Sequence, residues 1–177
     1  MSKRKIVLYI AMSLDGFIAK PDGDISWLSL VDSPQEDYGY GDFIGGVDTV
    51  IMGRKTYEKV QSFGIEFPHK GRKCYVLSRS KAGFDENVEF YAGDIAELVT
   101  DLKNQDGKDI FVDGGAEAVN ELLRLDAFDE MTISVIPILL GDGIRLFKEE
   151  RPEKLLKLKS ATSYQSGLVK LYYLRNE

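Results

Sequence analysis

The sequence predicts a three-layer α/β fold, with a mostly parallel central sheet and an antiparallel hairpin at its C-terminal edge. Short apolar segments alternate with helical patterns as far as Asp126. Two strand-like segments, Leu155–Tyr164 and Leu168–Leu174, then flank Gln165-Ser166-Gly167, a spacing typical of a hairpin. Because the 177 residues contain no repeat, low-complexity tract or linker, we expect a single domain over residues 1–177.

The N-terminal part is expected to form a buried strand, a long loop and a helix. Ile, Val, Leu and Tyr dominate Lys5–Met12, which indicates a strand buried on both faces, and a loop follows over Ser13–Asp32. Ser33-Pro34-Gln35-Glu36 is typical of a capping box with proline at the first helical position. We therefore expect a helix that begins there and ends near Ile44, although two glycines lower its helix propensity.

Strands and helices then alternate until the terminal hairpin. Asp94 is expected to cap a helix, because Glu97 follows in the first turn and Gly107 lies just past the end of the apolar pattern. A loop is expected over Pro137–Gly143. The remaining expected strands are Asp48–Met52, Lys73–Leu77, Val88–Tyr91, Asp109–Val112 and Glu130–Ile136, and the other expected helices are Arg54–Ser62 and Ala116–Leu123.

The composition excludes several classes of protein. The longest apolar runs, Ile6–Met12 and Val135–Leu140, are too short to span a bilayer, and Ser13-Leu14-Asp15-Gly16 replaces the cleavage site of a signal peptide. One cysteine and one histidine permit no internal disulfide, cysteine zinc cluster or multi-histidine metal site. We expect a soluble cytoplasmic protein without a metal, in which Cys74 is buried and His69 lies exposed in a loop.

The charge distribution points to an anionic small molecule. The net charge of −6 argues against nucleic-acid binding, for which a basic domain is expected. Between Gly53 and Lys81, however, eight Lys and Arg residues accompany only two Glu residues. A positive region on an acidic protein suits a small polyanion, although a solvated face that carries lysines by chance explains it equally well.

Three strand ends are suited to binding an anion. In open α/β sheets, ligands bind at the carboxyl ends of the parallel strands, where Val50–Thr56, Val76–Ser80 and Val112–Ala116 are expected to lie. In the first segment, Gly53 allows close approach and Arg54 can form a bidentate contact with a phosphate at the start of a helix. Each segment alone is usually a plain strand exit, and neither a full Rossmann fingerprint nor a Walker A loop is present.

Five segments of the sequence resemble motifs of the dihydrofolate reductase superfamily. Within it, they are most similar to the C-terminal reductase domain of the bifunctional riboflavin-biosynthesis deaminase/reductase and its stand-alone relatives. They occur in family order and cover nearly the whole chain, whereas the deaminase half is absent. The five segments are IAMSLDGFIA (Ile10–Ala19), DTVIMGRKTYE (Asp48–Glu58), GRKCYVLSRS (Gly71–Ser80), IFVDGGAEAVNELL (Ile110–Leu123) and ILLGDGIRLF (Ile138–Phe147).

This resemblance implies a dihydrofolate reductase-like fold and an NADPH-dependent reductase. The positive region fits, because a second phosphate paired with cations distinguishes NADPH from NADH. The resemblance implies that Gly53, Arg54, Lys55 and Thr56 contact the pyrophosphate and the adenosine phosphate, and that Leu77, Ser78 and Arg79 contact the adenine and the 2′-phosphate. Gly114, Gly115 and Ala116 are implied under the pyrophosphate, and the family holds this diglycine as a cis peptide. Ala11, Ile18 and Ala19 are implied at the nicotinamide.

The resemblance also implies residues for the substrate. Asp37 falls at the carboxylate that folate reductases place on their first helix, and Glu36 takes this role if the alignment has a one-residue gap. Both have plain structural explanations, Glu36 as the capping-box partner of Ser33 and Asp37 as a favourable charge at a helix N-terminus. Ser134 lies near the position of a substrate-side hydroxyl. Trp27 could form the floor of a substrate pocket or fix the loop.

Together these observations predict a reductase that transfers hydride from NADPH to a small heterocyclic substrate, resembling 5-amino-6-(5-phosphoribosylamino)uracil reductase. The alternatives are a folate or pterin reductase and a non-catalytic nucleotide-binding module of the same fold. We expect no nucleic-acid or membrane partner. A homodimer through the terminal hairpin is expected, because Leu171–Leu174 is apolar on both faces of an edge strand.

Overall fold

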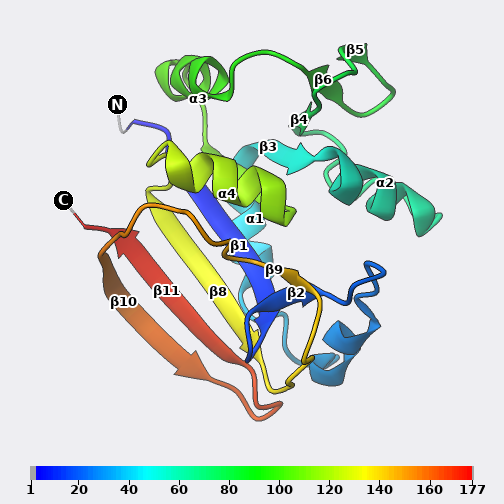
Figure 1. The fold of residues 1–177 in the computed structure, drawn as a ribbon, viewed down its shortest axis with the longest axis vertical. Coiled ribbons are helices and arrows are strands. Elements are labelled where there is room, and N and C mark those ends of the chain that lie inside the picture. The colour runs from blue at the N-terminus through cyan, green and yellow to red at the C-terminus, as the bar shows by residue number, and fades with distance from the viewer. Residues whose placement is uncertain (1–2, 177) are drawn as a thin grey trace.

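The computed structural model describes residues 3–176 and contains a nine-stranded sheet with helices on both faces (Figure 1). The strands are β1 (Ile6–Ser13), β2 (Phe17–Ala19), β3 (Val47–Gly53), β4 (Lys73–Leu77), β5 (Gly83–Phe84), β6 (Glu89–Tyr91), β7 (Asp109–Gly114), β8 (Glu130–Ile136), β9 (Ile144–Arg145), β10 (Leu156–Ser163) and β11 (Val169–Arg175). The helices are α1 (Tyr40–Gly45), α2 (Arg54–Ser62), α3 (Ile95–Asn104), α4 (Ala116–Arg124) and a 3₁₀ helix, Ser26–Val31.

The sheet has the strand order β10-β11-β8-β1-β7-β3-β4-β6-β5. All neighbours from β8 to β6 in this order are parallel, whereas β10, β11 and β5 pair antiparallel. The predicted fold class and the terminal hairpin are confirmed. Because β7, β3 and β4 are adjacent and parallel, their carboxyl ends lie side by side at one edge of the sheet.

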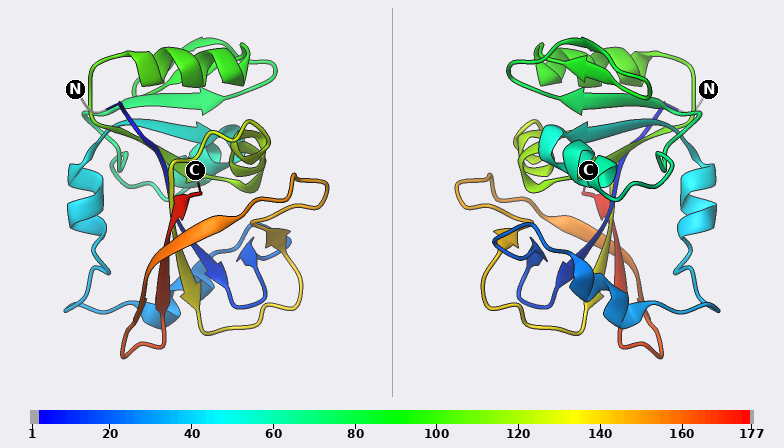
Figure 2. Two further views of the ribbon diagram at one scale, coloured as in Figure 1. Left: turned by 90° about the vertical axis from the view of Figure 1, so that its left-hand side faces the viewer. Right: turned by 90° about the vertical axis from the view of Figure 1, so that its right-hand side faces the viewer.

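Two hydrophobic clusters hold the helices against the two faces of the sheet. On one face, Leu102 of α3 and Leu122 of α4 pack with the side chains of β1, β3, β7 and β8. On the other face, Phe43 of α1 and Tyr57 of α2 pack with Val50 and its neighbours. Figure 2 shows α1 and α4 on opposite sides of the sheet. Burial on both faces explains why the central strands are nearly continuous apolar runs.

The prediction that a helix begins at Ser33-Pro34-Gln35-Glu36 is wrong. Glu36 does not reach back toward Ser33; its carboxylate instead accepts a hydrogen bond from the Tyr38 N–H at 2.8 Å. Tyr38 has φ 57° and Gly39 has φ 79°, and two successive residues in the left-handed region interrupt a right-handed helix. The helix α1 therefore begins only at Tyr40 and is six residues long.

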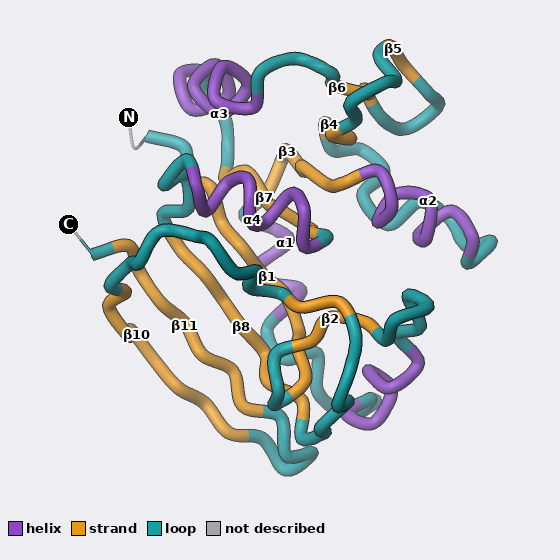
Figure 3. Tube along the Cα trace, viewed as in Figure 1, coloured by secondary structure: helices purple, strands orange, loops and turns teal. Residues whose placement is uncertain are grey.

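The loop expected over Ser13–Asp32 also contains regular structure. Its β2 strand pairs with β9, and the 3₁₀ helix Ser26–Val31 buries Trp27 and Val31 against the sheet. The strands β2, β5 and β9, of two or three residues each, are too short for a periodic pattern. Between β8 and β10 the chain is mostly loop (Figure 3). Leu171–Leu174, expected on an edge strand, instead lie in β11, which pairs with β10 on one side and β8 on the other, so this premise of the dimer prediction is wrong. The edge strand is β10, and the homodimer through the terminal hairpin stays a prediction.

Truncation of Leu122 is expected to test the packing of α4. This side chain is fully buried in the cluster of α3, α4 and the sheet. Leu122→Ala is expected to lower the free energy of unfolding by about 2–5 kcal/mol, because it removes buried methyl groups and leaves a cavity. Leu125→Ala is the matched control, because Leu125 is 42 % exposed. Urea denaturation of both variants provides the measurement, and an equal loss in the two would contradict the assigned packing.

Candidate functional site

The three strand ends singled out in the sequence lie next to one another. In the sheet, Met52 of β3 pairs with Gly114 of β7, and Gly53 pairs with Leu77 of β4. The helices α2 and α4 begin directly after β3 and β7. Residues 53–56, 77–79 and 114–116 thus form one continuous edge, which we call the glycine edge.

The glycine edge is closely packed because its central residues lack side chains. A Cβ atom on Gly53 would lie 3.6 Å from the Gly115 nitrogen. One on Gly115 would lie 3.0 Å from Thr56 Oγ1, tighter than an ordinary contact. The Gly114–Gly115 peptide is cis, as in the family that the sequence resembles. The start of α2 thereby lies against the start of α4.

Both helix starts at this edge have backbone N–H groups without a side-chain cap. The N-cap residues are Gly53 for α2 and Gly115 for α4, and neither has a side chain that could accept a hydrogen bond. By contrast, the Asp94 carboxylate accepts from two N–H groups at the start of α3. Uncapped N–H groups and the positive end of the helix dipole favour an anion.

Positive side chains surround the same helix starts. Lys148 forms an ion pair with Glu117 in the first turn of α4. This hydrogen bond is the main cause that lowers the pKa of Glu117, and the charges of Arg79 and Lys55 lower it further. Lys55 and Arg79 therefore lie within electrostatic reach of the α4 start. Arg54 is half exposed, and its Nε lies 3.3 Å from Glu58 Oε1 one turn along α2.

The residues expected at the nicotinamide lie beside this edge. Ala11 lies near the end of β1 and pairs with Ser134 of β8. Ile18 and Ala19 belong to β2, where Ala19 is buried and Ile18 packs against the sheet. A Cβ atom on Gly114 would lie 3.5 Å from Cδ1 of Ile10, so the end of β1 adjoins the diglycine.

The loop that carries Ile18 and Ala19 is anchored by Asp15. This carboxylate accepts hydrogen bonds from the Ser13 hydroxyl at 2.6 Å, from the Leu140 N–H at 3.1 Å and from the Gly141 N–H at 2.8 Å. These bonds, led by that of Ser13, lower the pKa of Asp15 to about 2. Asp15 thus joins the chain after β1 to the chain after β8.

The two carboxylates expected on the first helix bind the backbone. Asp37 accepts from the Gly39 N–H at 2.8 Å and from the Gly41 N–H at 3.0 Å. The bond to Gly41 is the main cause that lowers the pKa of Asp37, and the bond to Gly39 is the next. Asp37 and Glu36 are both exposed and lie before α1 rather than within it. Both therefore orient the turn that leads into this helix.

Trp27 and Ser134 lie close to the end of β1. Trp27 is 5 % exposed, and its Nε1 donor has no hydrogen-bond partner among the described residues. It packs in a cluster with Ala11, Val31 and Ile136. Ser134 is buried on β8 directly beside Ala11. A buried donor without a partner is uncommon and indicates a place where a ligand or water can accept from it.

The expectation that His69 is exposed is wrong. The side chain is 2 % exposed, and its Nε2 lies 2.9 Å from Oδ2 of Asp113. Its ring packs edge-on against Phe67 and Phe111. Asp113, the last residue before the diglycine, is a carboxylate that the sequence analysis did not single out. Its position directly before Gly114-Gly115 was the available signal. Cys74 is buried as expected, which raises the pKa of its thiol to about 12.

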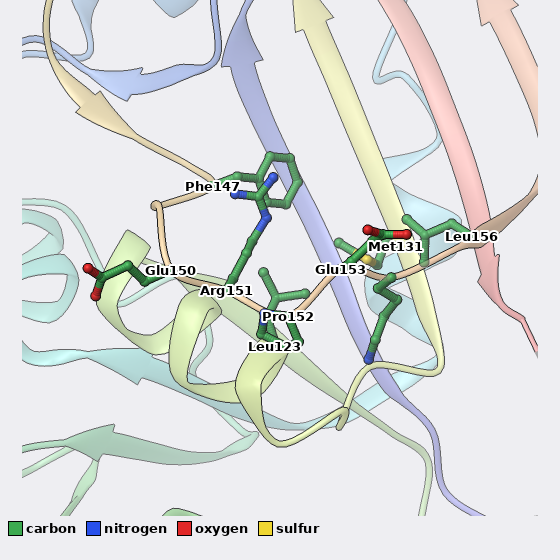
Figure 4. A pocket seen from close by; sticks show the side chains of 9 residues that line it. Leu123, Met131, Phe147, Glu150, Arg151, Pro152, Glu153 and Leu156 are labelled. Atoms are coloured by element: carbon green, nitrogen blue, oxygen red, sulfur yellow. The ribbon is translucent and has the colours of Figure 1, made fainter.

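A hollow elsewhere on the surface is separate from the glycine edge. It has a volume of about 500 Å³ and lies between α4, the start of β8 and the segment that leads into β10 (Figure 4). Leu123, Met131, Phe147 and Arg151 line it, with no residue of the glycine edge among its lining.

Within residues 3–176, no group of three or more His, Cys, Asp or Glu side chains is arranged to hold a metal ion. None of the helices in the same range is long and apolar enough to cross a membrane.

Comparisons with known proteins agree with the fold. YwjB of Bacillus subtilis (strain 168), an uncharacterized protein, is 45 % identical over 174 residues and covers 98 % of this chain and 99 % of its own. The crystal structure of a Shewanella sp. PV-4 protein named for riboflavin biosynthesis is 30 % identical, with a TM-score of 0.90 over 98 % of this chain and 99 % of that one.

A third comparison supports the fold alone, because its sequence identity is only 17 %. It is the diaminohydroxyphosphoribosylaminopyrimidine deaminase/5-amino-6-(5-phosphoribosylamino)uracil reductase of Thermotoga maritima. The match has a TM-score of 0.72 and covers 98 % of this chain and 57 % of that one.

The strand order and the terminal hairpin define a three-layer α/β domain whose fold is shared with the Thermotoga maritima structure. The family model of the RibD C-terminal domain matches residues 4–170. The chain belongs to the RibD C-terminal domain family.

Titration of Asp15 is expected to release the anchored loop at low pH. Its folded-state pKa of about 2 lies below the ordinary value of 3.8. The stabilisation is therefore fully present above about pH 4 and is lost as the pH falls toward 2. At pH 7, Asp15→Asn is expected to accelerate hydrogen exchange of the Leu140 and Gly141 amides.

Asp142→Asn is the control for this experiment, because within the described residues the Asp142 carboxylate accepts only from the neighbouring Gly143 N–H. Exchange at Leu140 and Gly141 that is equally slow in wild type and Asp15→Asn would show that Asp15 does not hold the loop.

Proposed function

We propose that this protein is an NADPH-dependent reductase that transfers hydride to a small heterocyclic substrate, in the manner of 5-amino-6-(5-phosphoribosylamino)uracil reductase. The observation that carries the proposal is the glycine edge, where two uncapped helix starts adjoin each other and the charges of Lys55, Arg79 and Lys148 act on the first turn of α4. Family membership supports a reductase-like role. The pyrophosphate and the 2′-phosphate of the cofactor are assigned to this edge.

Each part of the glycine edge has a distinct role in the proposal. The N–H groups that follow Gly53 and Gly115 would bind the pyrophosphate, because they have no side-chain acceptor of their own. The hydroxyl of Thr56 lies beside Gly115 and can donate to the same phosphate group. Arg54, Lys55 and Arg79 would bind the adenosine phosphates, and Leu77 and Ser78 would flank the adenine.

Ala11, Ile18 and Ala19 would enclose the nicotinamide, whose hydride the bound cofactor supplies. These side chains are small or apolar and lie where β1 and β2 meet the diglycine. Hydride transfer requires contact between the two reacting carbons and exclusion of water. An apolar wall held in place by the Asp15 anchor meets both requirements.

The substrate would lie on the α1 side of β1 and β7. Trp27 Nε1 offers a donor there that nothing in the described chain accepts, and Ser134 offers a buried hydroxyl. Carboxylates are available from Asp37, whose oxygens already accept from two backbone N–H groups, and from Asp113. A heterocycle with N–H groups matches a carboxylate and a hydroxyl, because it donates to both.

The rival functions are separated by a screen of NADPH oxidation. Dihydrofolate, the deaminated riboflavin precursor and simple quinones are tested as acceptors. Oxidation with dihydrofolate alone would identify a folate reductase. Saturable NADPH binding without oxidation for any acceptor would indicate a nucleotide-binding module, and absence of binding at millimolar NADPH would refute the proposed function.

Arg79 is expected to distinguish NADPH from NADH. Arg79→Ala should raise the Kd for NADPH about tenfold, because it removes one charge-assisted hydrogen bond to the 2′-phosphate. The Kd for NADH should hardly change. Titration is followed by the fluorescence of Trp27, the single tryptophan.

Lys70→Ala is the control for Arg79→Ala, because Lys70 is exposed, pairs with Glu66 and belongs to the same positive stretch of sequence. Equal weakening of NADPH and NADH by Arg79→Ala would place Arg79 away from the 2′-phosphate.

Asp37→Asn separates the two candidate substrate classes. Folate reduction requires a proton on the ring, and loss of the carboxylate is expected to abolish it. Hydride transfer to a sugar-derived carbon requires no ring protonation, so turnover is expected to stay within about threefold of wild type. Asp32→Asn, an exposed carboxylate on the same loop, is the control. Loss of both activities would assign Asp37 to substrate binding in general.

A further inference from the structure

His69 is the most deeply buried ionisable ring in the described chain, and it contacts one carboxylate. His69 belongs to the loop between α2 and β4 and lies against the sheet, where its ring packs against Phe111 of β7 and Phe67 of the same loop. Its Nε2 lies 2.9 Å from Asp113 Oδ2. Asp113 is two residues beyond Phe111, so both side chains lie on the same face of β7.

The other ring nitrogen defines the direction of this hydrogen bond. Nδ1 is buried and has no partner among the described residues. A proton on Nδ1 would be a buried donor without an acceptor, which is unfavourable. The ring therefore carries its proton on Nε2 and donates to Asp113. The Nε2–H and Asp113 Oδ2 then form one hydrogen bond, and Nδ1 stays an acceptor without a partner among the described residues.

The Asp113 carboxylate has a second oxygen available at the edge of the sheet. Oδ1 accepts no hydrogen bond from the part of the chain that the structure describes, and the side chain is 25 % exposed. Asp113 also acts on Tyr40 of α1, whose pKa is raised mainly by burial and next by the charge of Asp113. Tyr40 is 38 % exposed. Asp113 thus faces the side of the sheet that α1 borders.

We propose that His69 is a positioning residue, which holds Asp113 so that its free oxygen meets a donor N–H or O–H of the heterocyclic substrate beside Tyr40. This inference rests on the proposed function and extends it to the substrate side. Because Asp113 directly precedes the cis diglycine, a substrate held by it lies next to the proposed nicotinamide position. His69 itself is fully enclosed and does not touch the substrate.

A hydrogen bond to one oxygen of the Asp113 carboxylate restricts rotation of the group and thereby fixes the direction of the other oxygen. A donor on Oδ2 restricts the second torsion of Asp113, so Oδ1 keeps one direction before the substrate arrives. Preorganisation of this kind lowers the barrier when the bound geometry is close to the reacting one. The expected signature is a change in turnover and substrate affinity, without a change in affinity for NADPH.

The His69–Asp113 contact can be measured by NMR without an activity assay, because His69 is the single histidine of the sequence and its imidazole signals are therefore unambiguous. In ¹⁵N-labelled protein, the imidazole spectrum is expected to show the Nε2–H tautomer, with a downfield Nε2 proton. Asp113→Ala should move this proton upfield and accelerate its exchange with water. A spectrum of the Nδ1–H tautomer, or one unchanged by Asp113→Ala, would overturn the proposal.

Two His69 variants of nearly equal length test the positioning role. His69→Gln keeps an N–H donor that can reach Asp113, whereas His69→Met fills similar space without one. His69→Met is expected to lower kcat/KM about tenfold or more, the effect of one charge-assisted hydrogen bond. His69→Gln should stay within about threefold of wild type. The Kd for NADPH should be unchanged in both.

A double-mutant cycle connects the two residues. In the Asp113→Ala background, His69→Met is expected to cause no further loss. Losses that multiply, or full activity of folded His69→Met, would overturn the proposal. Thermal melting verifies folding, and the spectrum of Asp113→Ala decides the question if His69→Met does not fold. A wild-type protein that does not bind NADPH would instead refute the proposed function, whatever the imidazole spectrum shows.

Discussion

The close approach of β3 and β7 at their carboxyl ends is the constraint on which the rest of this structure depends. Gly53 and Gly115 meet without side chains, with less than 4 Å between the Gly115 nitrogen and the place of a Gly53 Cβ. This contact brings the starts of α2 and α4 together and leaves both without a side-chain acceptor. The helix dipoles and the cations of the neighbouring strand end then act on one small volume. Packing of two strands, rather than any single residue, thus places the two uncapped helix starts side by side.

The two faces of the sheet differ in the side chains that pack on them. On the face of α3 and α4, large aliphatic side chains such as Leu102, Leu122 and Ile110 form a continuous core. On the face of α1, aromatic and polar side chains pack among the apolar ones, including Tyr9, Tyr40 and His69. Burial raises the pKa of Tyr9 to about 12, so its hydroxyl keeps its proton and donates to the Tyr38 carbonyl. Both faces therefore carry a buried apolar core, and the α1 face adds the Tyr hydroxyls and the His69 ring.

The parallel sheet, the hairpin and the adjacency of Arg54, Ser78 and Gly114 could be predicted from the sequence. The periodicity of apolar residues and the glycines between strands and helices are signals contained in short segments of the chain. The conformation that replaces the helix expected from Ser33 could not be predicted, since the left-handed conformation of Tyr38 is fixed by distant contacts with Val31, Ser166 and Lys170. The burial of His69 likewise depends on Phe111 and Asp113, more than forty residues away. Local patterns carry no information about such partners.

The exposed edge of β10 has features that disfavour pairing with a further strand. Lys157 and Lys159 alternate with small or apolar residues along this strand, and all its residues except Leu156 are exposed. Ammonium groups on a bare hydrogen-bonding margin disfavour the docking of an identical strand, because like charges would then face each other. Side-by-side pairing of two β10 strands is therefore disfavoured, so a homodimer through the terminal hairpin would have to pack a face of the hairpin rather than extend the sheet.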